Sequence, residues 1–85
     1  MHDLHAADKV LKMILASASK NGLKRVNSAQ IVLGTIVEHG EEILPENLKF
    51  NVESLARNTL ADGIKVSVCR NEGRDIVLKE IEGDK

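Results

Sequence analysis

The amino-acid sequence predicts a two-layer α/β domain, in which two helices cover one face of a small three-stranded mixed sheet. Three observations support this fold class. At 85 residues, the chain has the length of one compact domain, spanning residues 1–85. Apolar residues recur with a helical period in two segments, alternate with polar residues in two others, and form a short run in a fifth. Their order along the chain is helix, strand, helix, strand, strand, which suits two helices packed on one sheet.

The first helix is predicted between residues 4 and 18. Its apolar residues recur at three- and four-residue steps and form one stripe: Leu4, Ala7, Leu11, Ile14 and Ala18. Asp3 is expected to be the N-cap, because its carboxylate can accept hydrogen bonds from the first backbone N–H groups. Asn21 and Gly22 supply the left-handed residue that ends a helix.

The first strand is predicted between Arg25 and Leu33, followed by Gly34. One face is expected to carry Ala29, Ile31 and Leu33, and the other Val26, Ser28, Gln30 and Val32. Residues 35–44 are expected to form a loop of acidic character. This loop holds His39 among Glu38, Glu41 and Glu42.

A second helix is predicted from Pro45, because proline at the first helical position loses no backbone hydrogen bond. Its apolar face is expected to follow helical steps through Leu48, Val52, Leu55 and Thr59. The pair Asp62-Gly63 marks the turn after it.

Two strands complete the predicted sheet. Residues 64–69 alternate between apolar and polar side chains, and the turn at 71–73 contains a glycine, as hairpin turns prefer. The returning strand is expected at residues 76–81. Its first three residues are all apolar, which favours a strand covered on both faces or a central strand.

Composition narrows the possible functions. The net charge is −1 and the only aromatic residue is Phe50, so a nucleic-acid or anionic-membrane partner is not expected. No apolar stretch approaches the ~20 residues of a membrane span, and no signal peptide is recognised, which predicts a cytoplasmic protein. The single cysteine, Cys69, excludes an internal disulfide and a cysteine-rich zinc site. No motif for catalysis is found, so an enzyme is not expected.

The first three residues, Met1-His2-Asp3, carry a possible metal chemistry. If Met1 bears a free α-amine, that amine, a backbone nitrogen and the imidazole of His2 can surround one small cation in fused chelate rings. Nitrogen ligands of this kind suit Ni(II) or Cu(II) in square-planar geometry. The alternative is an ordinary frayed terminus.

Six segments of the sequence also resemble, in order and spacing, the HypA family of nickel-incorporation metallochaperones, which act in hydrogenase and urease maturation. These segments are residues 1–4, 21–26, 31–34, 45–50, 58–63 and 73–82. The resemblance implies that Ni(II) is held by the terminal amine, nearby backbone nitrogens and the imidazole of the second residue, which map onto Met1, His2 and Asp3. It also implies transfer to maturation partners, namely an accessory GTPase and the hydrogenase large subunit.

The sequence departs from this family in three places. The third residue is usually Glu, whereas this chain has Asp3, whose shorter carboxylate is a stronger helix cap and can be structural instead of a ligand. The family inserts a zinc ribbon with two Cys-x-x-Cys pairs between its last two strands, and only residues 70–73 stand there, so no structural zinc is expected. The loop at residues 35–44 is longer than the family's usual connection.

These departures leave a second hypothesis open. The chain could keep the fold and act only as a protein–protein interaction or regulatory module. An exposed sheet edge could then pair with another chain, and a homodimer is one such arrangement. His5 and His39 are minor candidates for metal ligands, and solvent-exposed side chains are the plainer interpretation of both. Cys69 is a minor candidate for a reactive thiol, and a small buried hydrophobic side chain is the plainer interpretation.

Overall fold

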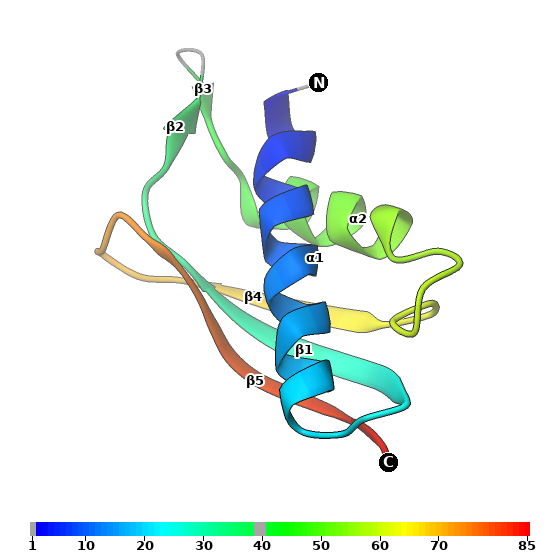
Figure 1. Ribbon diagram of the computed structural model, residues 1–85. Coiled ribbons are helices and arrows are strands. Elements are labelled where there is room, and N and C mark those ends of the chain that lie inside the picture. The colour runs from blue at the N-terminus through cyan, green and yellow to red at the C-terminus, as the bar shows by residue number, and fades with distance from the viewer. Residues whose placement is uncertain (1, 39–40) are drawn as a thin grey trace.

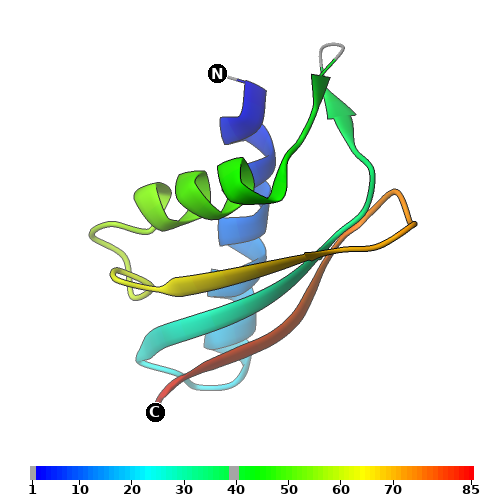
Figure 2. The ribbon, with the colours of Figure 1, turned by 180° about the vertical axis from the view of Figure 1, so that it is seen from behind.

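The computed structural model describes the backbone of residues 2–38 and 41–85 and the side chains of residues 6–36 and 42–85. Its elements are α1 (His2–Lys20), β1 (Arg25–Leu33), β2 (Val37–Glu38), β3 (Glu41–Glu42), α2 (Pro45–Leu55), β4 (Lys65–Arg70) and β5 (Ile76–Asp84). The main sheet has the order β4-β1-β5, and β1 is parallel to β4 and antiparallel to β5. Both helices pack on one face of this sheet (Figures 1 and 2). The predicted α/β fold class and element order are confirmed.

The core lies between the helices and the sheet and is aliphatic, as the composition predicts. No polar or charged residue is buried among the described side chains. The largest fully buried side chains come from α1, β1, β4, α2 and the segment before α2: Ile14, Ile31, Leu33, Ile43, Leu48, Val10, Val26, Val52 and Val66. Burial of such side chains stabilises a small domain by roughly 1.5–3 kcal/mol each before entropy is counted.

The first helix ends as predicted but begins earlier. Gly22 takes a left-handed φ of 70°, the Leu23 N–H donates to the Ala18 carbonyl (2.9 Å), and the Gly22 N–H donates to the Ser19 carbonyl (3.2 Å). These bonds form a Schellman motif. The helix begins at His2, so Asp3 lies inside its first turn. An N-cap needs a non-helical backbone, and the prediction that Asp3 is the N-cap was therefore wrong.

The pairing of β1 with β5 is interrupted by two β-bulges, one in each strand. The register shifts between Val26 and Ser28 and again between Gln30 and Ile31. The first shift leaves Asn27 as an extra residue and turns Val26, with none of its surface exposed, into the core. The prediction that Val26 shares a face with Ser28 was wrong, because strict alternation ignores a bulge.

The second helix ends before Thr59. Asn58 has a φ of 65°, which stops the helical path, and its N–H donates to the Asp62 carboxylate (3.1 Å). The Thr59 hydroxyl donates to the Ala56 carbonyl (2.6 Å), so Thr59 stabilises the turn after the helix instead of extending its apolar face. The predicted start at Pro45 is confirmed.

A short hairpin replaces the predicted loop between β1 and α2. Val37 pairs with Glu42, and Glu38 pairs with Glu41, in antiparallel strands of two residues each. Such short strands have too few residues for alternation to reveal them. The hairpin and the first turn of α1 lie at the same end of the molecule (Figures 1 and 2).

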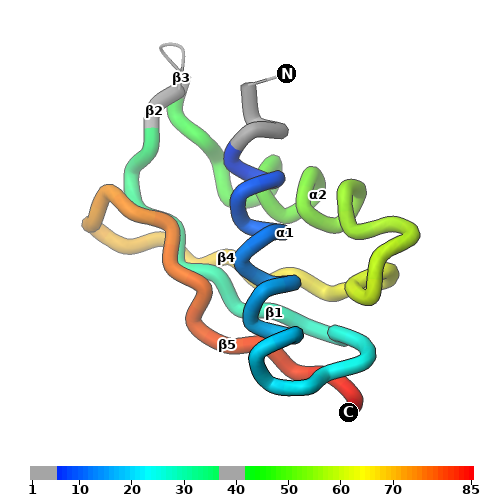
Figure 3. Tube along the Cα trace, in the orientation of Figure 1, coloured from blue at the N-terminus to red at the C-terminus, as the bar shows by residue number. Residues whose placement is uncertain are grey.

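The last strand lies at an edge of the sheet. β5 pairs only with β1 within the main sheet, and 49% of Val77 is exposed on the face opposite the helices. The expectation of a central strand, or one covered on both faces, was wrong. Local hydrophobicity cannot tell which strand takes the central position, and here β1 takes it. The prediction of a hairpin between the last two strands was therefore wrong, because β1 lies between β4 and β5 and pairs with both. Figure 3 traces the chain path. The C-terminal end of β5 lies beside the connection between α1 and β1.

Candidate metal centre

The predicted metal site lies at the start of α1. The structure places the backbone of His2 and Asp3 in the first helical turn. Met1 and the side chains of His2 and Asp3 lie outside the described residues. The first N–H groups of a helix have no intrahelical acceptor, so the backbone nitrogens of this turn are not already committed to helical hydrogen bonds. This feature suits a site that uses backbone nitrogen as a ligand.

The helix is anchored immediately after this turn. Ala6 and Ala7 are buried in the core, and α1 packs against α2. On the exposed side of α1, the Lys12 ammonium lies 3.0 Å from the Asp8 carboxylate. A ligand at the first turn would therefore sit beside a helix that the core holds in place.

The acidic hairpin beside this end is tied to the sheet. The Arg70 guanidinium at the end of β4 forms an ion pair with the Glu42 carboxylate. His39 lies outside the described residues, as do the side chains of His5, Glu38 and Glu41. Within the part of the chain that the structure describes, no three His, Cys, Asp or Glu residues gather in a group that could hold a metal.

The short connection between β4 and β5 is held against the end of β1. The Asn71 N–H donates to the Leu33 carbonyl (3.0 Å), the Thr35 N–H to the Gly73 carbonyl (2.7 Å) and the Gly34 N–H to the Asp75 carbonyl (2.9 Å). A side chain at Gly34 would meet the backbone of Gly73 and the Arg74 nitrogen. The turn is therefore fixed in the fold by backbone hydrogen bonds and close backbone packing. Cys69, just before it, is a free and exposed thiol.

Glu53 on α2 is a structural carboxylate that sequence reasoning missed. It accepts hydrogen bonds from the Lys49 ammonium (2.7 Å) and from the Val66 N–H of β4 (3.0 Å). Partial burial alone would raise the pKa of Glu53, but these two hydrogen bonds and the Lys49 charge together lower it below its ordinary value. The Lys49/Glu53 spacing signals the ion pair, whereas the bond to Val66 has no signal in sequence.

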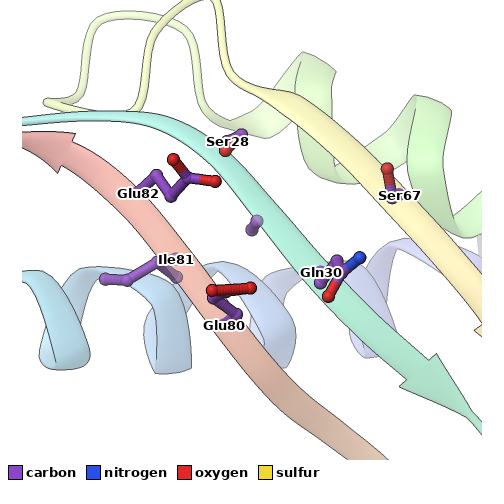
Figure 4. A pocket seen from close by; sticks show the side chains of 7 residues that line it. Ser28, Gln30, Ser67, Glu80, Ile81 and Glu82 are labelled. Carbon is purple, nitrogen blue, oxygen red and sulfur yellow. The ribbon is translucent and has the colours of Figure 1, made fainter.

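The sheet face opposite the helices is open and polar. A hollow of about 170 Å³ on this face is lined mainly by Ser28, Gln30, Ser67, Glu80 and Glu82. Figure 4 looks onto this face, with the helices behind the strands. Among the described residues, neither glutamate takes part in an ion pair. None of the helices in residues 2–38 and 41–85 has the length and apolar character that crossing a membrane requires.

These features define a small two-layer α/β domain with a candidate metal site at the start of its first helix. Comparison with curated proteins finds similarity to the hydrogenase maturation factor HypA of Pyrococcus furiosus, 34% identical over 90 residues. The HypA proteins of Thermococcus gammatolerans and Thermococcus kodakarensis are 31% and 30% identical over alignments of the same length. Each alignment covers 96% of this chain and 62% of the relative. No protein-family model matches the chain.

The chain is a HypA-like protein, homologous to the HypA hydrogenase maturation factors over nearly its whole length. It spans less than two thirds of the length of these relatives. Its single cysteine cannot provide the two Cys-x-x-Cys pairs that the resemblance associates with the zinc ribbon.

Proposed function

We propose that this protein is a nickel-binding, non-catalytic metallochaperone-like protein of the cytoplasm, acting in hydrogenase maturation. Ni(II) would be its cargo, held by the α-amine of Met1, backbone nitrogen and the His2 imidazole. The observation that carries the proposal is homology to proteins named hydrogenase maturation factor HypA, in a chain that reads Met1-His2-Asp3. Residues 1–85 would act as one nickel-binding-type domain, with the turn at 70–73 in place of a zinc ribbon.

The geometry of α1 supports an exchangeable site. A ligand set at the first turn lies at one end of α1, before Ala6 and Ala7, whose burial fixes the helix, so an acceptor protein could approach the metal without unfolding the core. The helix dipole disfavours a bare cation at this end. Deprotonated backbone nitrogens would offset that cost, because they carry negative charge to the metal. Asp3 could add a carboxylate ligand or orient the complex.

Nickel titration of a single histidine variant tests this proposal. We expect His2→Ala to abolish near-stoichiometric Ni(II) binding in isothermal calorimetry, because the imidazole is lost from the chelate. His5→Ala is the matched control, since it removes a histidine from the same helix, and it should bind as the parent does. Binding by the parent should also weaken in mild acid, because protons compete with the metal for its nitrogen ligands. Equal affinity in the two variants would refute the assignment.

A second function is favoured by the closed turn between β4 and β5. Hydrogen bonds hold this turn against Leu33, Gly34 and Thr35, so the fold is complete without an inserted zinc ribbon. The chain could therefore be an interaction or regulatory module that no longer delivers metal. Capture of maturation proteins such as the accessory GTPase, measured with and without Ni(II), separates the two functions. Metal-dependent capture supports the chaperone, and equal capture in EDTA supports the module.

A further inference from the structure

The two edge strands of the main sheet differ in whether their outward backbone groups are bonded to another element. At the β4 edge, the Glu53 carboxylate of α2 accepts the hydrogen bond of the Val66 N–H. At the β5 edge, no strand of the described residues lies beyond Ile76–Asp84. An edge strand presents alternating N–H and C=O groups that can pair with another chain. Both strands are edges, but β5 is the longer one, and an α2 carboxylate already occupies an outward N–H of β4, so β5 is the edge more open to strand addition.

A groove runs beside this open edge. It has a volume of about 480 Å³ and lies between residues 79–83 of β5 and the C-terminal end of α1, where Ser17, Asn21 and Leu23 line it. Side chains of an added strand would alternate between this groove and the opposite face of the sheet. The groove has the place and size to take small side chains, for which Leu23 and Ile81 are the apolar contacts within an otherwise polar lining.

The bulge at Lys79 limits where a strand can pair. Gln30 faces Glu80 and Ile31 faces Leu78, so Lys79 is the extra residue in β5. Bulges interrupt regular pairing and twist an edge away from incoming strands. The longer regular segment of β5 is therefore residues 80–84, against three residues at 76–78, and it borders the groove.

The acidic side chains of this edge determine which charge the partner segment should carry. Glu80 and Glu82 are exposed, point to the open face and line its polar hollow (Figure 4). Residues opposite them on an added strand would be their cross-strand neighbours, where opposite charges stabilise pairing and like charges weaken it. The favoured segment carries Lys or Arg at alternate positions, with small aliphatic residues between them.

The same charges disfavour a second copy of this chain. A two-fold antiparallel β5–β5 pair keeps the same faces aligned, so residues of equal parity oppose each other. Any such pairing centred within residues 80–84 sets an acidic residue against an acidic residue: Glu80, Glu82 or Asp84 against one of the same three. Like-charge pairs of this kind destabilise a sheet.

We propose that the 80–84 edge of β5 binds an extended, alternately basic segment of a partner protein by strand addition. This proposal does not depend on nickel, and its test is made in EDTA. The probe is a labelled peptide, acetyl-Lys-Val-Lys-Val-Lys-amide, titrated by fluorescence anisotropy. Two controls are the rearranged peptide Lys-Lys-Val-Val-Lys, which breaks the alternation, and Glu-Val-Glu-Val-Glu, which reverses the charge. We expect binding of the first peptide only.

Charge reversal at β5 tests where on the protein the peptide binds. The double variant Glu80→Lys/Glu82→Lys should bind the Lys-Val peptide at least about tenfold more weakly, because two opposite-charge pairs become like-charge pairs. It should instead bind the Glu-Val peptide. Glu46→Lys/Glu72→Lys changes the net charge equally, away from β5, and should leave binding unchanged. Circular dichroism checks that both variants fold.

Peptide-induced amide shifts in NMR spectra should cluster in residues 79–84 and 17–23. Three results would overturn the proposal: equal binding of the rearranged peptide, an unchanged affinity in the β5 double variant, or no binding at millimolar peptide. Dimerisation of the free chain through β5 in analytical ultracentrifugation would assign the edge to a second copy instead.

Discussion

Glu53 joins α2 to the edge of the sheet with one carboxylate. It is bound to the Lys49 ammonium and the Val66 N–H, and its pKa is lowered from 4.5. A carboxyl with a lowered pKa in the folded state stabilises the fold above its unfolded pKa, and this contribution is lost as the pH falls through the folded value. Glu53 should therefore support the fold at neutral pH and cease to do so in acid.

We expect Glu53→Gln to lower the free energy of unfolding by about 1 kcal/mol at pH 7, because a charge-assisted hydrogen bond becomes a neutral one. The difference from the parent should shrink below about pH 4.5. Urea denaturation at pH 7, 5 and 3.5 measures it. Glu72→Gln, an exposed change in the β4–β5 turn, is the control and should shift stability by less than about 0.5 kcal/mol. If the difference in the free energy of unfolding does not change with pH, the carboxylate charge of Glu53 is not its cause.

Gly34 is required by close packing of two backbones. A methyl group there would lie 2.8 Å from the Arg74 nitrogen and still nearer the Gly73 carbonyl, and backbone atoms cannot turn aside. We expect Gly34→Ala to destabilise the fold by about 2–3 kcal/mol in thermal or urea unfolding. Gly73→Ala is the matched control, because it meets only the Asn71 side chain at 3.2 Å, which can move. Similar losses in the two variants would contradict this account.

At the scale of elements, the end of α1 rests on one backbone conformation. Gly22 has a φ of 70°, and a methyl group there would meet nothing within 4 Å. We expect Gly22→Ala to cost about 1 kcal/mol purely through the left-handed backbone. Gly22→Asn should cost less, because Asn tolerates this conformation better. Thermal unfolding compares the three proteins, and an Ala variant as stable as the parent would rule out the Schellman motif as a contributor.

The elements that sequence predicts well are those with long periodic patterns. The stripe in α1, the proline at the start of α2 and the alternation in β4 each identify their element. The two-residue strands β2 and β3 leave no such pattern. The Asn27 and Lys79 bulges also escape prediction, because only the pairing between distant strands reveals an extra residue. Thr59 misleads for the opposite reason, since it continues the helical spacing although the helix ends at Leu55 and Asn58 has a left-handed backbone.

The candidate nickel site is predicted from sequence in another way. Its residues are adjacent in the chain, so chemistry and resemblance identify Met1, His2 and Asp3 without any fold. The structure adds that α1 begins at His2. By contrast, the groove beside β5 joins residues near 20 with residues near 80. No local pattern indicates that they meet.

On the scale of the whole molecule, the two proposed sites lie at opposite ends of α1. The nickel site is at the first turn, and the β5 groove is at the last turn, separated by a helix roughly 28 Å long at 1.5 Å per residue. The core packs against the helix between them. A partner held at the sheet edge would leave the metal end of the helix uncovered. The molecule, with extents of 40 × 24 × 17 Å, is thus large enough to separate docking from metal exchange.

The central claim is that the α-amine of Met1 is itself a nickel ligand. The most direct test is calorimetric Ni(II) titration of the untagged chain beginning at Met1, beside the same chain with one glycine added before Met1. The added residue turns the amine into an amide while leaving His2, Asp3 and His5 in place. We predict near-stoichiometric binding by the first chain and its loss in the second. Equal affinity in both would contradict the amino-terminal site.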